Sequence, residues 1–100
     1  MRIAVPDLIS NSYFPAIAAV ELGFFEAEGL DAKRVELFFP VPKMMEALRN
    51  EEFDFVAGSA HATLMAFPEW KGAKLFVALA QRMYWLLILR TNLKVNRGDI

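Results

Sequence analysis

The sequence predicts an α/β domain with a mostly parallel, doubly wound sheet. Short apolar runs alternate with segments of helical length along the chain, and the first three runs end at Pro or Gly residues that interrupt a strand. Strands that alternate with helices pair in parallel through right-handed crossovers and carry helices on both faces of the sheet. The expected order is β-α-β-α-β-α-β-β.

The first strand is expected at residues 2–6, where Pro6 and the following Asp end it. Ser12 is then the expected N-cap of a helix that carries Pro15 in its first turn, where a missing N–H costs little. Gly29 fits the left-handed position after the last turn, with Leu30 folding back onto the helix.

Two further strands are expected at residues 35–39 and 53–57, with a helix between them that starts near Pro42. A third helix runs from about Ala60 to Pro68. In the helix after Pro42, apolar positions recur at helical spacing and predict a buried face. That face consists of Met44, Met45 and Leu48, and the wet face of Lys43, Glu46 and Arg49.

A fourth strand is expected at residues 74–80, because this run is continuously apolar, as in strands covered on both faces. Residues 84–90 are the expected fifth strand. We therefore expect a ligand-binding lobe over residues 1–91, and residues 92–100 are polar and resemble a linker toward a second lobe.

Composition and charge exclude several classes of function. One hundred residues hold at most one domain, and 56% of them are hydrophobic, above the usual 45–50%. The net charge is −1 with no basic stripe, so a nucleic-acid partner is not expected. There is no cysteine and no phosphate-binding glycine motif. The apolar runs are too short to span a bilayer, and no signal peptide is recognisable at the N-terminus.

A ligand of such a sheet binds beyond the carboxyl ends of its strands. This rule selects the loops at residues 8–13, 39–42, 58–61 and 81–85. Three of them carry hydrogen-bonding side chains of mostly neutral character, which suit a small polar or anionic molecule. These candidate ligand contacts are Ser10, Asn11, Ser12, Tyr13, Ser59, His61, Gln81 and Tyr84.

The stretch from Asp54 to His61 carries the strongest local signal. An apolar run breaks at Gly58 and is followed by Ser59 at the start of a helix, an arrangement that places free backbone N–H groups beside a ligand. The competing interpretation, in which Ser59 only caps its helix, fits the local pattern equally well.

Catalysis and metal binding have little support in the sequence. His61 is the single histidine, and the carboxylates show no metal-ligand spacing. Ser59 and His61 lie two residues apart without an evident orienting acid, so they do not form a recognisable triad. We therefore expect no catalytic residue, no metal and no cofactor.

Four stretches resemble one protein family in order and spacing. These are PAIAAVELGFFEAEGL, FFPVPKMMEAL, DFVAGSAHATLMAF and AKLFVALAQ, and together the match covers nearly all of residues 1–99. The chain resembles the solute-binding proteins of bacterial ABC importers, in the class that serves nitrate, alkylsulfonates, taurine and thiamine pyrimidine precursors. The resemblance implies the first lobe of a type II periplasmic-binding fold, whose ligand is trapped against a second lobe.

The family's ligand positions in this lobe fall on residues 10–13, on Ser59, Ala60 and His61, and around Gln81. The resemblance implies a small-molecule ligand, an ABC permease as membrane partner, and a periplasmic or lipid-anchored protein. The absence of a signal peptide leaves a cytoplasmic location open. Two other interpretations remain: an enzyme of thiamine-pyrimidine biosynthesis on the same scaffold, or a lobe that associates with itself through exposed apolar surface. The enzyme would need a reactive lysine, whereas all five lysines, Lys33, Lys43, Lys71, Lys74 and Lys94, have the pattern of solvated surface residues.

Overall fold

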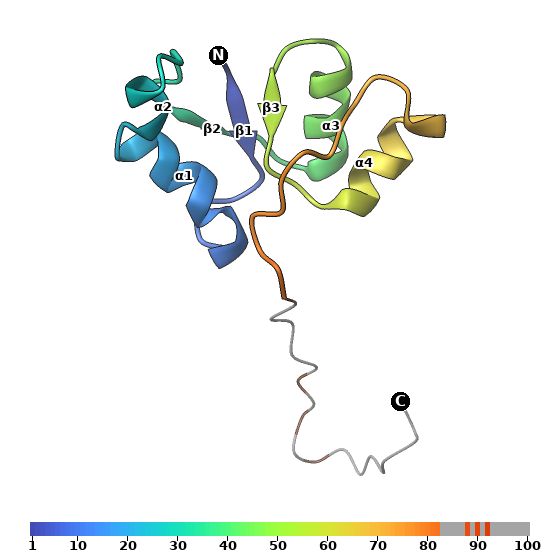
Figure 1. The fold of residues 1–100 in the computed structure, drawn as a ribbon. Coiled ribbons are helices and arrows are strands. Elements are labelled where there is room, and N and C mark those ends of the chain that lie inside the picture. Colours follow the sequence, from blue (N-terminus) through green and yellow to red (C-terminus); the bar gives the residue numbers. More distant parts are fainter. Residues whose placement is uncertain (83–87, 89, 91, 93–100) are drawn as a thin grey trace.

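A three-stranded parallel sheet forms the centre of the molecule in the computed structural model, which describes residues 1–82, 88, 90 and 92 (Figure 1). The strands are β1 (Ile3–Val5), β2 (Val35–Leu37) and β3 (Phe55–Val56), in the order β2-β1-β3. The second strand in sequence, β2, therefore lies on one side of β1, and the third, β3, lies on the other side. The direction in which strands are added reverses at β1. The protein is an α/β domain, as the sequence predicts.

Helices cover both faces of this sheet. Neighbouring residues of β1 point to opposite faces, and each face carries its own cluster of buried apolar side chains. Ile3 belongs to a cluster on one face with Val20 and Ala32, against which Phe25 packs. Ala4 belongs to a cluster on the other face. That cluster contains Met44, Met45, Ala47 and Phe53, with Ala62 and Ala66 packed against it. The first two α-helices therefore lie on the Ile3 face and the next two on the Ala4 face (Figure 1).

The region after β1 differs in detail from the prediction. It contains the 3₁₀ helix η1 (Asn11–Tyr13), α1 (Phe14–Glu21) and α2 (Phe24–Ala27). The expectation that Ser12 is the N-cap was wrong, because Ser12 lies inside η1 and Tyr13 occupies the cap position of α1. Gly23 divides the expected single helix, since its φ of 72° lies in the left-handed region and interrupts the helical backbone.

The end of this helical region agrees with the prediction. Gly29 adopts a φ of 75°, and the Leu30 N–H donates to the carbonyl of Phe25 at 2.8 Å. This bond spans the turn as in a Schellman motif and satisfies a carbonyl that the helix end would leave free.

The remaining helices are α3 (Val41–Arg49), α4 (Ala60–Ala66) and the 3₁₀ helix η2 (Pro68–Trp70). Met44 and Met45 are fully buried and Leu48 is partly buried, which confirms the predicted apolar face of α3. The helix α4 packs against α3, and Phe67 at its end is buried. Burial of one apolar stripe per helix is the main stabilising contribution expected for elements this short.

Arg2 joins the three strands at their amino-terminal ends. Its guanidinium donates to both carboxylate oxygens of Glu36 on β2, at 3.1 and 3.2 Å, and to the carbonyl of Glu52, while its backbone N–H donates to Asp54 at 2.7 Å. The guanidinium carbon also lies 4.6 Å from the centre of the Phe53 ring. The hydrogen bond to Arg2 holds the pKa of Glu36 below its usual value.

The expected fourth strand is absent: residues 74–80 have no regular secondary structure and do not join the sheet. Leu75, Phe76 and Val77 are 54%, 73% and 61% exposed, so this apolar run is not covered on both faces. The prediction was wrong because apolarity alone does not fix a strand; the run also needs the ladder hydrogen bonds of a neighbour. The expected strand at 84–90 and the linker at 92–100 lie outside the described residues, apart from Ile88, Arg90 and Asn92.

Candidate functional site

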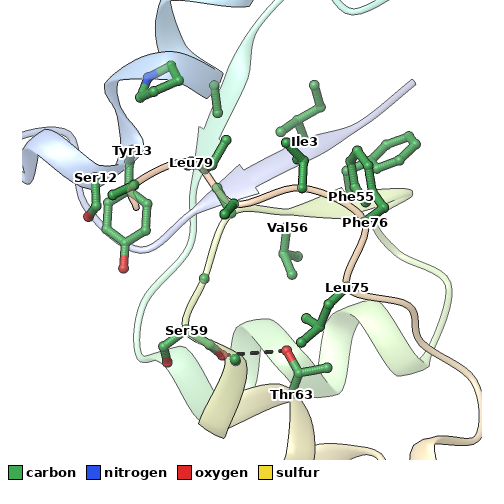
Figure 2. A pocket seen from close by; sticks show the side chains of 18 of the residues that line it. Ile3, Ser12, Tyr13, Phe55, Val56, Ser59, Thr63, Leu75, Phe76 and Leu79 are labelled. Carbon is green, nitrogen blue, oxygen red and sulfur yellow. Dashed lines mark hydrogen bonds between the residues drawn. The ribbon is translucent and has the colours of Figure 1, made fainter. Parts of the chain in front are cut away.

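A pocket of about 1140 Å³ opens on the Ile3 face of the sheet, and residues 74–82 form one of its walls (Figure 2). Ile3 and Phe55, which are paired across β1 and β3, form part of its floor on the sheet. The pocket extends to the carboxyl ends of β1 and β3, where the chain turns into η1 and α4. It therefore lies where a parallel sheet with a reversal of strand order binds its ligands.

Three of the predicted segments meet at this pocket. Ser12 and Tyr13 of η1 line one side of the pocket. Ser59, Ala60 and His61 line it at the start of α4, and Gln81 lines it from the 74–82 wall. In Figure 2, Ser12 and Tyr13 lie across the hollow from Leu75 and Phe76, and Ser59 lies along its lower edge. The structure thus brings together side chains that are up to 69 positions apart in sequence (Ser12 to Gln81).

Two other predicted residues, Ser10 and Asn11, do not line the pocket. Tyr84 lies outside the described residues. The Ser10 hydroxyl instead donates to the carboxylate of Asp7 at 2.7 Å. The sequence could not show this, because a serine in a loop has the same appearance whether its hydroxyl faces a ligand or a nearby side chain.

Ser59 occupies the N-cap position of α4 without forming the capping bond. Its backbone is extended, as an N-cap requires, but its side chain makes no hydrogen bond to the first amides of the helix. The Ser59 Oγ lies 3.4 Å from Nε2 of His61, and the Ser59 carbonyl accepts a hydrogen bond from the Thr63 hydroxyl at 3.5 Å (Figure 2). The hydroxyl is therefore positioned at the pocket and is not used to cap the helix.

Asp7 organises the loop that leads from β1 to η1. Its Oδ1 accepts the backbone N–H groups of Ile9 and Ser10, at 3.0 and 2.6 Å, and its Oδ2 accepts the Ser10 hydroxyl. These hydrogen bonds, that of the Ser10 hydroxyl first, lower the pKa of Asp7 below its usual value. The carboxylate is therefore the form that the loop stabilises.

The apolar wall of the pocket was not predicted. Phe55 on β3 and Phe76 in the 74–82 wall pack edge to face, with ring centres 5.6 Å apart, and Leu75, Leu79 and Phe25 also line the pocket. Phe76 was expected inside a buried strand, so its contribution to a ligand pocket could not be inferred. The weak signal available was the alternation of Phe55 with Val56, which places one of the two on each face of the sheet.

The charge of the lining has a single sign. Among the described residues that form the wall, none is Asp or Glu, whereas Lys74 and Arg82 are cationic. Lys74 is exposed, as the sequence predicts, and it also faces this pocket. The lining therefore combines cations, neutral hydrogen-bonding groups and aromatic surface, which fits a small anion with an apolar body.

Neither a metal centre nor a membrane-crossing element emerges from the part of the chain that the structure describes. No three His, Cys, Asp or Glu side chains gather there in a way that could hold a metal ion. None of the helices in that part has the length and apolar character needed to cross a bilayer. Comparisons with protein-family models, with curated proteins and with solved structures found no match.

Proposed function

We propose that this domain is the ligand-binding lobe of a solute-binding protein that captures a small organic anion and delivers it to an ABC permease. The observation that carries the proposal is the pocket at the carboxyl ends of β1 and β3. Its described lining contains Lys74, Arg82 and neutral donors and no carboxylate side chain. An anion entering such a pocket meets donors without like-charge repulsion.

The neutral donors would fix the orientation of the anionic group. Ser59 and Ser12 present hydroxyls, and Gln81 presents an amide, at the same opening. Because the Ser59 hydroxyl is not occupied by a capping bond, it can donate to a ligand oxygen without destabilising α4. The aromatic pair Phe55 and Phe76 would contact the apolar part of the ligand.

The resemblance of the sequence to the solute-binding proteins of ABC importers agrees with this chemistry. In the finer form of the proposal, the domain is the first lobe of a type II periplasmic-binding fold, and a second lobe completes the ligand contacts. Ligand then favours the closed arrangement of the lobes by binding it more tightly than the open one. No bond of the ligand is broken, and the protein is not an enzyme.

Isothermal titration calorimetry with a panel matched in size and different in charge tests the proposal. The panel consists of butanesulfonate, benzenesulfonate, benzoate, neutral benzamide and cationic benzylamine. We expect saturable one-site binding of at least one anion, with weaker binding of the neutral and cationic compounds. Binding should weaken in a Ser59→Ala/Gln81→Ala double variant and persist in Glu46→Ala, on the exposed side of α3. Equal binding of anions and cations, or no binding of any compound, would contradict the proposal.

A further inference from the structure

The loop that presents the Ser12–Tyr13 side of the pocket has little packing of its own. Leu8 and Ile9, the first two residues after Asp7, are 52% and 85% exposed. Exposed apolar side chains do little to fix a backbone, so hydrogen bonds contribute much of the order at the start of this loop. Three of them are accepted by one side chain, the carboxylate of Asp7.

A continuous chain of hydrogen bonds leads from Asp7 to the pocket. The carboxylate accepts the backbone N–H of Ser10 at 2.6 Å and its hydroxyl at 2.7 Å. The carbonyl of Ser10 in turn accepts the backbone N–H of Tyr13 at 3.0 Å, which closes the first turn of η1. Tyr13 lines the pocket, whereas Asp7 and Ser10 do not. Asp7 therefore acts on the pocket only through the loop.

We propose that Asp7 is a positioning residue for the pocket: its carboxylate holds the 8–13 loop in the single conformation that presents Ser12 and Tyr13 to a ligand. The inference rests on the proposed function for its consequence on binding, but its structural part stands on the hydrogen bonds alone. When the carboxylate is removed, the loop samples conformations that do not complete the wall. Apparent affinity then falls in proportion to the fraction of molecules that keep the competent conformation.

Site-directed spin labelling tests the structural part directly. The chain contains no cysteine, so Asn11→Cys gives a unique attachment site for a nitroxide on the exposed side of the loop, and Glu46→Cys gives a matched site on α3. Electron paramagnetic resonance spectra are compared for each label in the parent chain and with Asp7→Ala, Asp7→Asn or Ser10→Ala. We expect increased mobility at position 11 in all three variants, and an unchanged spectrum at position 46.

The size of the effect should follow the hydrogen bonds that each variant removes. Asp7→Ala removes all three and should mobilise the label most. Asp7→Asn keeps an oxygen acceptor for the two backbone N–H groups, and Ser10→Ala removes only the hydroxyl bond, so both should have smaller effects. An unchanged spectrum at position 11 in Asp7→Ala would overturn the proposal, as would equal changes at both labels, which indicate general unfolding.

Binding of benzenesulfonate to the unlabelled Asp7→Ala variant supplies the second measurement. A tenfold or greater loss of affinity, with the parent fold retained by circular dichroism, is the expected result. Unchanged affinity in a variant with a mobile loop would overturn the link between the loop and the pocket. If the parent chain itself binds no compound of the panel, the proposed function fails, whereas the spin-label comparison still decides whether Asp7 fixes the loop.

Discussion

The hydroxyl of Ser59 lies 3.4 Å from Nε2 of His61 and forms no capping bond to the helix α4 that it precedes. A serine at an N-cap ordinarily accepts a hydrogen bond from the second or third amide of its helix. Here the side chain is turned toward a neighbour that also lines the pocket. The Ser59 hydroxyl and the His61 ring therefore lie together at the pocket, although the sequence pattern alone would assign Ser59 to helix capping.

Ser59→Ala should separate these two roles. Loss of a capping serine usually costs about 1 kcal/mol, but with no capping bond to lose we expect a change below about 0.5 kcal/mol in the free energy of unfolding. Affinity for the ligand anion should fall clearly in the same variant. Urea unfolding followed by circular dichroism measures the first quantity and calorimetric titration the second. A loss of stability near 1 kcal/mol with unchanged affinity would show that Ser59 is only a cap.

Met44→Ala should be strongly destabilising. The Met44 side chain is fully buried in the cluster between the sheet and α3, so its truncation removes apolar contacts and leaves a cavity. We expect a loss of about 2–5 kcal/mol in the free energy of unfolding. Glu46→Ala, two positions away on the exposed side of α3, should change it by less than about 0.5 kcal/mol. Similar values for both variants would mean that α3 does not bury this face.

The contact between Phe55 and Phe76 can be tested with a double-mutant cycle. The two rings pack edge to face at 5.6 Å and tie residues 74–80 to β3. Aromatic pairs contribute about 0.5–1.5 kcal/mol beyond their buried area, and the exposure of Phe76 places this pair at the lower end. Urea unfolding of Phe55→Ala, Phe76→Ala and the double variant should therefore give a coupling near 0.5 kcal/mol. A coupling of zero would place residues 74–80 away from the sheet.

Acid should release the loop that Asp7 holds. The folded-state pKa of Asp7 is lowered, so its contribution is fully present above the unfolded-state value, about 4, and is lost as the pH falls through the folded-state value. The spin label at position 11 should thus keep one spectrum between pH 5 and 8 and become progressively mobile as the pH falls from about 4 through the lower folded-state pKa. In Asp7→Asn, the spectrum of the label at position 11 should not change as the pH falls below about 4, until general unfolding also changes the spectrum of the label at position 46. A parent loop that stays ordered in acid would contradict this assignment.

Much of the fold could be predicted because the apolar residues that the sequence pattern places on one face are the ones that the structure buries. The alternation of short apolar runs with amphipathic segments led to the parallel sheet. Met44 and Met45 lie four and three positions before Leu48, which is helical spacing, and both methionines are buried. Gly29 was recognised because only a few residue types tolerate its backbone conformation. Residues 74–80 could not be predicted in the same way, since an apolar run forms a strand only if a neighbouring edge pairs with it.

The candidate site was predictable at the level of segments and less so at the level of side chains. The rule for ligand sites in parallel sheets selected residues 8–13, 39–42, 58–61 and 81–85. Parts of the first, third and fourth of these loops line one pocket, whereas residues 39–42 do not line it. Which serine faces the pocket depends on a local competition that sequence does not reveal: Asp7 captures the Ser10 hydroxyl and leaves Ser12 at the wall. The aromatic and cationic wall arises from the placement of Phe76 and Lys74, which follows from tertiary structure.

The central claim is that a small anion binds where the η1 loop, the start of α4 and Gln81 meet. Two-dimensional ¹H–¹⁵N NMR of the ¹⁵N-labelled chain, titrated with benzenesulfonate, tests it most directly because it maps weak binding residue by residue. The account predicts saturable shifts of the amides of Ser12, Tyr13, Ser59, His61 and Gln81, with those of the outer face of α3 unchanged. Shifts centred on another surface, or spectra that do not respond to any anion of the panel, would contradict it.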